Sequence, residues 1–228
     1  MDLDIKFKMN EKLFLRNPED SELGKNILQH SIIQIHKIGF ESFNFKKLAK
    51  EIKTTEASIY RYFENKHRLL LYIADWYWSW LEYRLVIQTR NIDDPEVKIK
   101  NAIQLLSSQV EEDLTTSYIN EKLLFEIVMK EGAKAYLTRH VTEDNKAKLF
   151  KPYKDLTARL SDMIIEYNPE YKYPRSLSST VIEMAHSQNF YMRHLPSLTD
   201  FTNEPGESGV LSFLEDMVFS CIRKNREL

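Results

Sequence analysis

Cysteine is almost absent from this sequence, which has Cys221 alone among its 228 residues. A single thiol excludes an internal disulfide framework and gives a zinc site no second cysteine, as is typical of proteins in a reducing compartment. No stretch approaches the roughly 18 consecutive apolar residues of a membrane span, and the opening MDLDIKFKMNEK has no apolar run resembling a signal peptide. We therefore expect a cytoplasmic protein with no membrane partner.

Glycine and proline are scarce as well, with 5 and 7 residues, which argues against long loops and disordered linkers. Strand patterns are nearly missing: residues 4–9 alternate charged and apolar side chains, but this segment is short. Hydrophobic residues make up 43% and charged residues 29%, which is globular composition. The chain is also long enough for a small module and a larger one, so we expect an all-α protein with two domains.

Positive charge gathers in one segment of the chain. Residues 21–72 contain nine lysine or arginine residues against five glutamates, whereas residues 73–228 contain 19 basic against 24 acidic residues. A basic module on an acidic body suits a protein that contacts a polyanion at one end.

The basic segment opens with signals for a long helix. Pro18 is a breaker, Ser21 is a capping residue, and Gly39 is a natural left-handed residue for the helix end. Between them, apolar residues recur at helical spacing: Ile27, Leu28, Ile32, Ile35 and Ile38. We treat residues 1–20 as an N-terminal arm that precedes this helix.

Two short helices are expected next. Asn44 can cap a helix whose apolar positions, Phe45, Leu48, Ala49 and Ile52, share one face. Residues 53–55 interrupt the pattern, and Thr55 is placed to cap a third helix. Two short helices joined by a tight turn and braced by a longer one have the geometry of a helix-turn-helix, whose second helix fits a DNA major groove.

These residues resemble the N-terminal domain of the TetR/AcrR regulators. The resemblance spans about fifty residues, and its most diagnostic part is the segment SIYRYFENK at 58–66 followed by the leucines at 69 and 70. The resemblance implies a DNA-binding domain at 21–72 with a recognition helix at about 55–62. It departs from the family at Lys53, where a glycine is common, so we expect a mildly strained turn there.

The resemblance also implies roles for single residues. Tyr60 and Lys66 match the family's phosphate contacts, and Asn44 and Lys46 lie where the preceding helix touches the DNA backbone. The residues that we expect to face bases are the polar positions of the recognition helix, where arginine can pair with guanine and glutamate can accept from cytosine: Thr55, Glu56, Ser58 and Arg61.

Residues 73–228 predict a larger helical bundle for ligand binding and dimerisation. Breakers and apolar periodicity indicate helices at about 66–89, 95–112, 118–130, 143–167 with a kink near Pro152, 175–195 and 207–225. In the family, the last two helices of each chain meet their symmetry mates, so the resemblance implies a homodimer on a palindromic operator. The apolar residues of these two helices could instead fill the core of a monomer.

The body also offers a candidate site for a small hydrophobic effector. Aromatic and apolar walls with a few polar groups suit a ligand pocket, and they suit an ordinary core equally well. The candidate lining residues are Trp76, Trp80, Tyr83, Phe125, Met129, Tyr136, His186 and Phe190.

An enzyme has little support in this sequence. Glu183 and His186 have the spacing found in di-iron bundles, and Glu64 and His67 repeat it, but the second pair lies at a helix junction and two further carboxylates are needed. There is no Gly-rich phosphate loop and no Gly-x-Ser-x-Gly elbow. We expect no catalytic residues, metal or cofactor. The leading hypothesis is a ligand-released repressor, and the alternatives are a DNA-bound scaffold acting through a protein partner and a helical metal enzyme.

Overall fold

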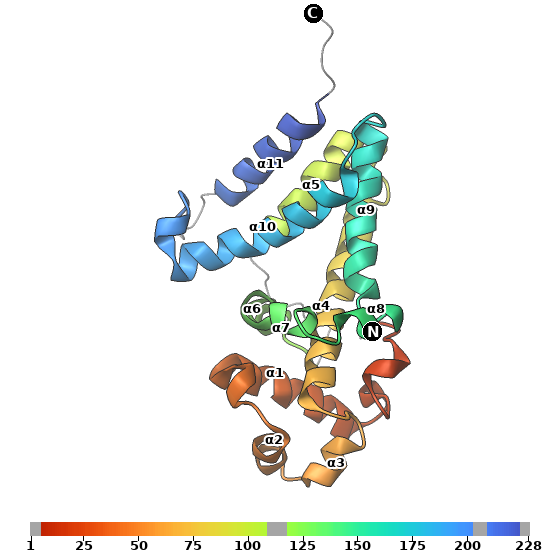
Figure 1. The fold of residues 1–228 in the computed structure, drawn as a ribbon, viewed down its shortest axis with the longest axis vertical. Helices are drawn as coiled ribbons and strands as arrows, with labels where there is room; N and C mark the ends of the chain where they lie inside the picture. Colours follow the sequence, from red (N-terminus) through yellow and green to blue (C-terminus); the bar gives the residue numbers. More distant parts are fainter. Residues whose placement is uncertain (1–5, 109–117, 203–208, 224–228) are drawn as a thin grey trace, which may run out of the picture. The chain divides into compact units, whose positions relative to one another are not determined.

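A computed structural model describes residues 6–108, 118–202 and 209–223. Every regular element in these residues is helical, and no strand is present among them. The all-α fold class expected from the composition is confirmed (Figure 1). None of the described helices is long and apolar enough to cross a membrane.

The chain forms two compact units. The described residues of Met1–Trp80 and Val110–Pro152 make up the first, and those of Leu81–Gln109 and Tyr153–Leu228 make up the second. Helix α4 (Lys66–Thr89) supplies residues to both. The other elements of the first unit are two 3-10 turns, η1 (Glu11–Leu13) and η2 (Pro18–Asp20), and the helices α1 (Glu22–Ser42), α2 (Phe45–Glu51), α3 (Glu56–Tyr60), α6 (Glu121–Glu131), α7 (Ala133–Tyr136) and α8 (Val141–Lys146).

The described residues of the second unit form four further helices and one 3-10 turn. Its elements are α5 (Pro95–Ser107), α9 (Lys151–Tyr167, which begins in the last residues of the first unit), α10 (Pro174–His194), η3 (Pro196–Leu198) and α11 (Gly209–Ile222). Helices α5, α10 and α11 pack on one another around Ile99, Ile103, Val181, Leu214 and Val218, all of which are buried. Cys221 near the end of α11 is a free, exposed thiol.

The helix starts follow the capping signals of the sequence. The Ser21 hydroxyl accepts a hydrogen bond from the Gly24 backbone N–H at 3.2 Å, as expected of a residue that caps α1. Helix α1 breaks at Gly39, whose φ of 75° and ψ of 156° lie in a region that is almost restricted to glycine.

Helix boundaries in the body differ from those expected. The single helix predicted for 143–167 is wrong, because the chain leaves α8 after Lys146 and passes through Lys148 with φ 62° before α9 begins. Pro152 therefore lies in the first turn of α9, where its missing N–H costs nothing, rather than at a kink. Gly132 is helical and separates α6 from α7. The expected helix end near 112 and the start at 207 fall outside the described residues.

Over its described residues, 6–20, the N-terminal arm has no strand, although its apolar residues alternate as a strand would. Residues 6–10 are irregular, and Met9 is buried while Lys6 and Lys8 are exposed. Farther along, Leu13 is only 1% exposed, so the arm packs onto the first unit.

Candidate nucleic-acid interface

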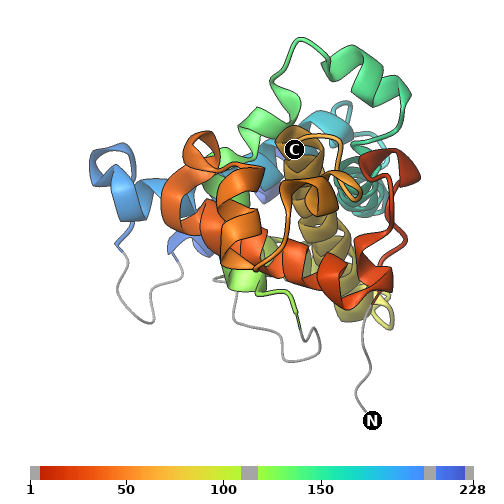
Figure 2. The same cartoon turned by 90° about the horizontal axis from the view of Figure 1, so that it is seen from below.

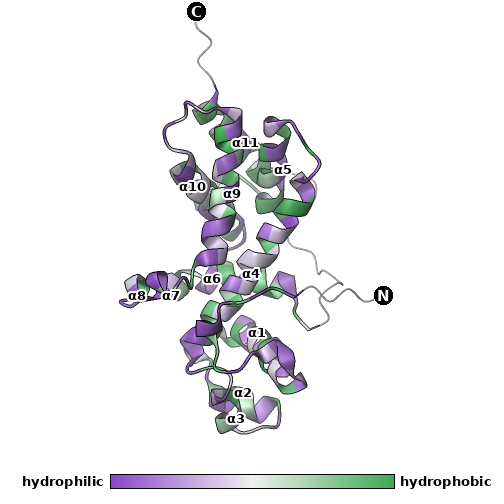
Figure 3. Ribbon diagram, turned by 90° about the vertical axis from the view of Figure 1, so that its right-hand side faces the viewer, coloured by the Kyte–Doolittle hydropathy of each residue, from purple (hydrophilic) through white to green (hydrophobic). Residues whose placement is uncertain are grey.

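Helices α2 and α3 form a pair with one packed face. Phe45, Leu48 and Ile59 are at most 4% exposed, and α2 contacts both α1 and α3. Figure 2 shows this pair beside α1, and Figure 3 shows that both helices carry hydrophobic and hydrophilic residues. The geometry is that of a helix-turn-helix braced by a longer helix.

The turn between α2 and α3 has the strained residue expected from the sequence. Lys53 adopts φ 53°, a left-handed conformation that a side chain disfavours. The Thr54 N–H donates to the Ala49 carbonyl at 2.9 Å, and this bond closes the turn. The turn therefore keeps its tight form without a glycine.

Four of the expected DNA contacts are exposed side chains on α2, on α3 or, for Arg61, directly after α3, which is shorter than the expected 55–62. Lys46, Glu56 and Arg61 are exposed, and Tyr60 is 47% exposed while its ring packs edge-on against Phe45. Within the described part of the chain, Lys46 and Arg61 form no ion pair, so their charges remain free for an anionic partner.

Two other candidates, Asn44 and Thr55, serve as local caps, and a third, Ser58, is bonded to one of them. The Asn44 Oδ1 accepts from the Lys47 N–H at 2.9 Å, and the Thr55 hydroxyl accepts from the Ser58 N–H at 3.2 Å, as expected for the starts of α2 and α3. The Thr55 and Ser58 hydroxyls also lie 2.9 Å apart. These side chains fix the helix starts, and each hydroxyl keeps bonding capacity for a further partner.

Lys66, at the start of α4, is held by the chain itself. Its Nζ donates to the carbonyls of Phe40, Glu41 and Phe43 at 2.9, 3.1 and 3.2 Å, and lies 4.6 Å from the centre of the Phe40 ring. An ammonium group has three N–H bonds, and all three are used. Lys66 thus ties the start of α4 to the segment that connects α1 and α2.

A second set of contacts holds the same segment from α6 and α7. The Phe40 N–H donates to Glu131 Oε1 at 3.0 Å. Lys134 bridges Glu131 at 2.7 Å and Glu41 at 3.1 Å, and its hydrogen bond holds the pKa of the Glu41 carboxyl below its usual value. Helix α1 also packs on α6, where His36 meets Glu126 at 2.7 Å. Residues far away in the sequence therefore fix the Gly39 break.

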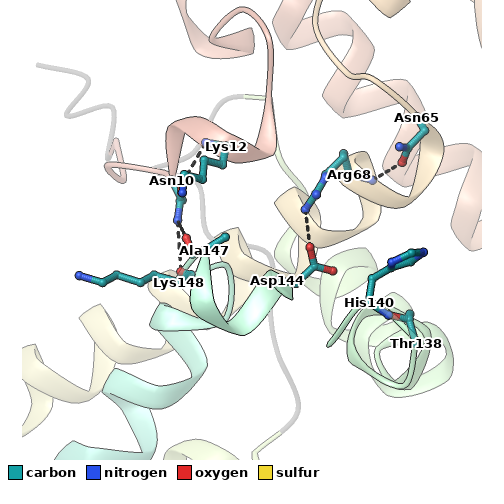
Figure 4. Close-up of polar contacts among 9 residues, drawn as sticks. All are labelled: Asn10, Lys12, Asn65, Arg68, Thr138, His140, Asp144, Ala147 and Lys148. Carbon is teal, nitrogen blue, oxygen red and sulfur yellow. Dashed lines mark hydrogen bonds and ion pairs between the residues drawn. The ribbon is translucent and has the colours of Figure 1, made fainter. Parts of the chain in front are cut away.

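Helix α8 makes a third attachment (Figure 4). Asp144, which is 4% exposed, accepts a hydrogen bond from Arg68 on α4 at 2.9 Å. The Asn10 side chain in the arm donates to the carbonyls of Ala147 and Lys148 at 3.0 and 3.2 Å. Local sequence patterns carry no signal for these pairs, because their members lie 76 to 138 residues apart.

The candidate effector residues divide between the two units. In the first unit, Trp76, Trp80 and Phe125 are at most 2% exposed, and two further candidates are half-buried. In the second unit, His186 is buried, Phe190 is half-buried and Tyr83 is 38% exposed. The two half-buried candidates of the first unit are Met129 and Tyr136.

Two buried ionisable groups stand out. Asp75 on α4 is 3% exposed, its Oδ2 has no hydrogen-bond partner among the described residues, and burial raises its pKa to about 8. No motif or spacing in the sequence singles out Asp75, although an aspartate within an aromatic helix is a visible signal of a buried charge. Burial also lowers the pKa of His186 to about 4, so this imidazole is neutral at pH 7.

Glu183 and His186, which have the spacing found in di-iron bundles, do not share one environment in the structure. Glu183 is exposed and accepts a hydrogen bond from the Tyr153 hydroxyl at 2.7 Å, whereas His186 is buried. Among the residues that the structure describes, no group of three or more histidine, cysteine or acidic side chains is placed to hold a metal ion.

Comparisons with known proteins agree with the helix-turn-helix. Residues 27–73 match the family model described as "Bacterial regulatory proteins, tetR family". No protein with a curated description matches the chain.

Several solved structures share the fold. One is AibR in complex with isovaleryl coenzyme A and operator DNA, with a TM-score of 0.57 and 16% identity over 87% of this chain and 98% of that one. Another is the fatty acid degradation regulator FadR from Bacillus halodurans, with a TM-score of 0.57 and 17% identity over 87% and 98%. A third is titled superantigen PfiT, with a TM-score of 0.57 and 13% identity over 87% and 95%. At such identities the likeness concerns the fold alone.

Proposed function

We propose that the chain is a transcription regulator of the tetR family, whose model its residues 27–73 match. Within that family it is a repressor that leaves a palindromic operator when a small hydrophobic ligand binds. The single observation that carries the DNA-binding part is the α2–α3 pair, which exposes Lys46 and Tyr60 and is followed directly by the exposed Arg61. Neither cation forms an ion pair with any described residue. We place the protein in the cytoplasm, where its operator lies, and assign it no catalysis and no cofactor.

Within this proposal the exposed residues divide by role. Tyr60 and Lys46 contact phosphates, which supply affinity without sequence information. Arg61 and Glu56 face base edges, with Thr55 and Ser58 beside them. Asn44 and Lys66 affect DNA binding indirectly, by holding helices in place. Asn44 caps the start of α2, and Lys66 fixes the start of α4.

Selection from random duplex DNA tests the DNA-binding proposal. We expect enrichment of a two-fold symmetric site at moderate salt. Arg61→Ala should relax the preference at one base position in each half-site, whereas Tyr60→Phe should weaken all sequences alike. Arg90→Ala is the matched control, because Arg90 is an exposed arginine of the second unit. Failure of the unmodified protein to enrich any duplex would refute the proposal.

Dimerisation is proposed through α10 and α11. Phe213 is 37% exposed on α11, and a two-fold symmetric pair of chains matches a palindrome. Phe213→Glu should lower the mass measured by light scattering to that of one chain and weaken operator binding. Ile165→Glu is the control, since Ile165 on α9 is similarly exposed at 42%. A monomeric unmodified protein would contradict this part.

The effector part of the proposal draws on buried aromatic residues such as Trp76, Trp80 and Phe125. Acyl coenzyme A thioesters and fatty acids of graded chain length are suitable probes, because AibR, which shares the fold, was solved with isovaleryl coenzyme A, and FadR, which also shares it, is a regulator of fatty acid degradation. A true effector should raise the melting temperature and release the operator. If no compound does so while DNA binding persists, the alternative holds, namely a DNA-bound scaffold that acts through a protein partner.

A further inference from the structure

The N-terminal arm is built into the first unit from both of its ends. At one end, the Asn10 side chain donates to two carbonyls that follow α8, and the Lys12 N–H donates back to Asn10 Oδ1 at 3.0 Å (Figure 4). Between the ends, Met9 and Leu13 are 8% and 1% exposed. The arm thus has a defined path over residues 6–16.

The other end of the arm lies against the end of the recognition helix. The Leu15 N–H donates to the Tyr62 carbonyl at 2.8 Å, and the Arg16 guanidinium carbon lies 5.3 Å from the centre of the Tyr62 ring. Tyr62 itself is 3% exposed and follows directly after Tyr60 and Arg61. Arg16 therefore covers the buried ring that adjoins the proposed DNA contacts.

The arm is basic and its charge is not compensated locally. Residues 6–16 carry four cationic side chains, all exposed, against the single carboxylate of Glu11. Within the described part of the chain, none of these cations forms an ion pair. The four are Lys6, Lys8, Lys12 and Arg16.

We propose that Arg16 is a further DNA-backbone contact, which adds a phosphate clamp beside the recognition helix. The contact of the Arg16 guanidinium with the Tyr62 ring restricts the side chain before DNA arrives, so less side-chain entropy is lost on binding. Arginine also presents paired donors that match phosphate oxygens. Such a contact adds affinity and register but no base preference. The inference rests on the proposed function, because it takes the α3 face to be the DNA-facing side.

The salt dependence of operator binding tests this contact. Each phosphate neutralised by a cation contributes about 0.9 to the slope of log affinity against log salt. Because a dimer carries two Arg16 side chains, Arg16→Ala should lower the magnitude of that slope by about 1.8 and weaken specific and random duplexes several-fold alike. Arg16→Lys should restore most of the slope, because it restores the charge.

Lys12→Ala is the matched control. It removes the same charge from the same arm, at the end held by Asn10, and should change the slope much less than Arg16→Ala. Circular dichroism melting of each variant checks that the unit is folded. Equal slopes for Arg16→Ala and the unmodified protein would overturn the inference, as would an equal loss for Arg16→Ala and Lys12→Ala. In both cases the unmodified protein still binds DNA, so the proposed function would survive.

Discussion

Replacing Lys66 with alanine should destabilise the first unit and weaken DNA binding without changing its salt dependence. In the structure, the Lys66 ammonium donates to three backbone carbonyls and none of its N–H bonds remains for a phosphate. Lys66 then acts on DNA only by fixing α4 against the chain between α1 and α2.

The expected size of the stability loss follows from these contacts. A hydrogen bond from a charged group contributes about 1.5–3 kcal/mol, but three acceptors share one half-buried ammonium, so the three bonds do not add in full. The contact with the Phe40 ring adds about 0.5–1 kcal/mol. We expect Lys66→Ala to lower the free energy of unfolding by about 3 kcal/mol, because the Phe40 and Phe43 carbonyls lie on residues that are at most 7% exposed.

Urea unfolding followed by tryptophan fluorescence measures this loss in the right unit. All three tryptophans lie on α4 within the first unit, so their emission reports on that unit. Lys50→Ala is the control: Lys50 is exposed on α2, and its loss should change stability by less than about 0.5 kcal/mol. Operator binding is then measured across salt concentrations.

Two results would refute the reasoning about Lys66. Unchanged stability in Lys66→Ala would show that the three carbonyl bonds contribute nothing. A salt slope reduced by about 1.8, or about 0.9 for each Lys66 of the dimer, with the domain still folded, would show that the ammonium leaves the carbonyls and binds a phosphate, as the family resemblance implies.

Three further perturbations follow from the structure. Asp75 has a pKa of about 8 in the folded protein against 3.8 as a free side chain, so the unfolded chain binds fewer protons between these pH values. The free energy of unfolding should therefore fall by about 1.4 kcal/mol per pH unit as pH rises from 5 to 8. Asp75→Asn should remove this dependence, and equal pH profiles for Asp75→Asn and the unmodified protein in urea unfolding would contradict the prediction. His186 has a pKa of about 4 in the folded protein instead of 6.5, so the unfolded chain binds more protons between these pH values. Acidification from pH 6.5 to 4 should therefore lower the free energy of unfolding by about 3 kcal/mol. The stability of His186→Gln should lack this contribution, and unfolding followed by circular dichroism at several pH values measures the difference. Gly39→Ala should cost about 1–3 kcal/mol because of its φ of 75°, whereas a melting temperature equal to the unmodified protein's would show that the break can be relieved.

Local signals in the sequence were enough to predict the helix-turn-helix. Asn44 and Thr55 cap helices as expected, since a short polar side chain before an apolar periodic segment acts within three residues. The positive φ of Lys53 was expected from the family resemblance, because the family commonly has a glycine at this position of the turn. Each of these features depends on neighbours in the chain.

Boundaries in the body were harder to predict. The pattern over 143–167 predicts one amphipathic helix. In the structure, however, Asp144 forms an ion pair with Arg68, and the chain turns at Lys148. A partner 76 residues away outweighs the local preference for continuing the helix.

Roles at the site were the least predictable. The sequence and the family resemblance single out Lys66, but three carbonyls from residues 40–43 occupy it. Arg16 lies in an arm with no regular structure, and only its position over Tyr62 connects it with the recognition helix. Both facts depend on the folded geometry of segments that are distant in sequence.

The exposed thiol of Cys221 makes the chain easy to label. Since the sequence contains no other cysteine, a maleimide spin label attaches at one position near the end of α11 without any mutation. If two chains pair as proposed, each particle carries two labels related by symmetry, and dipolar spectroscopy gives one distance between them. Recording that distance with and without operator DNA would follow the assembly in solution with its natural sequence intact.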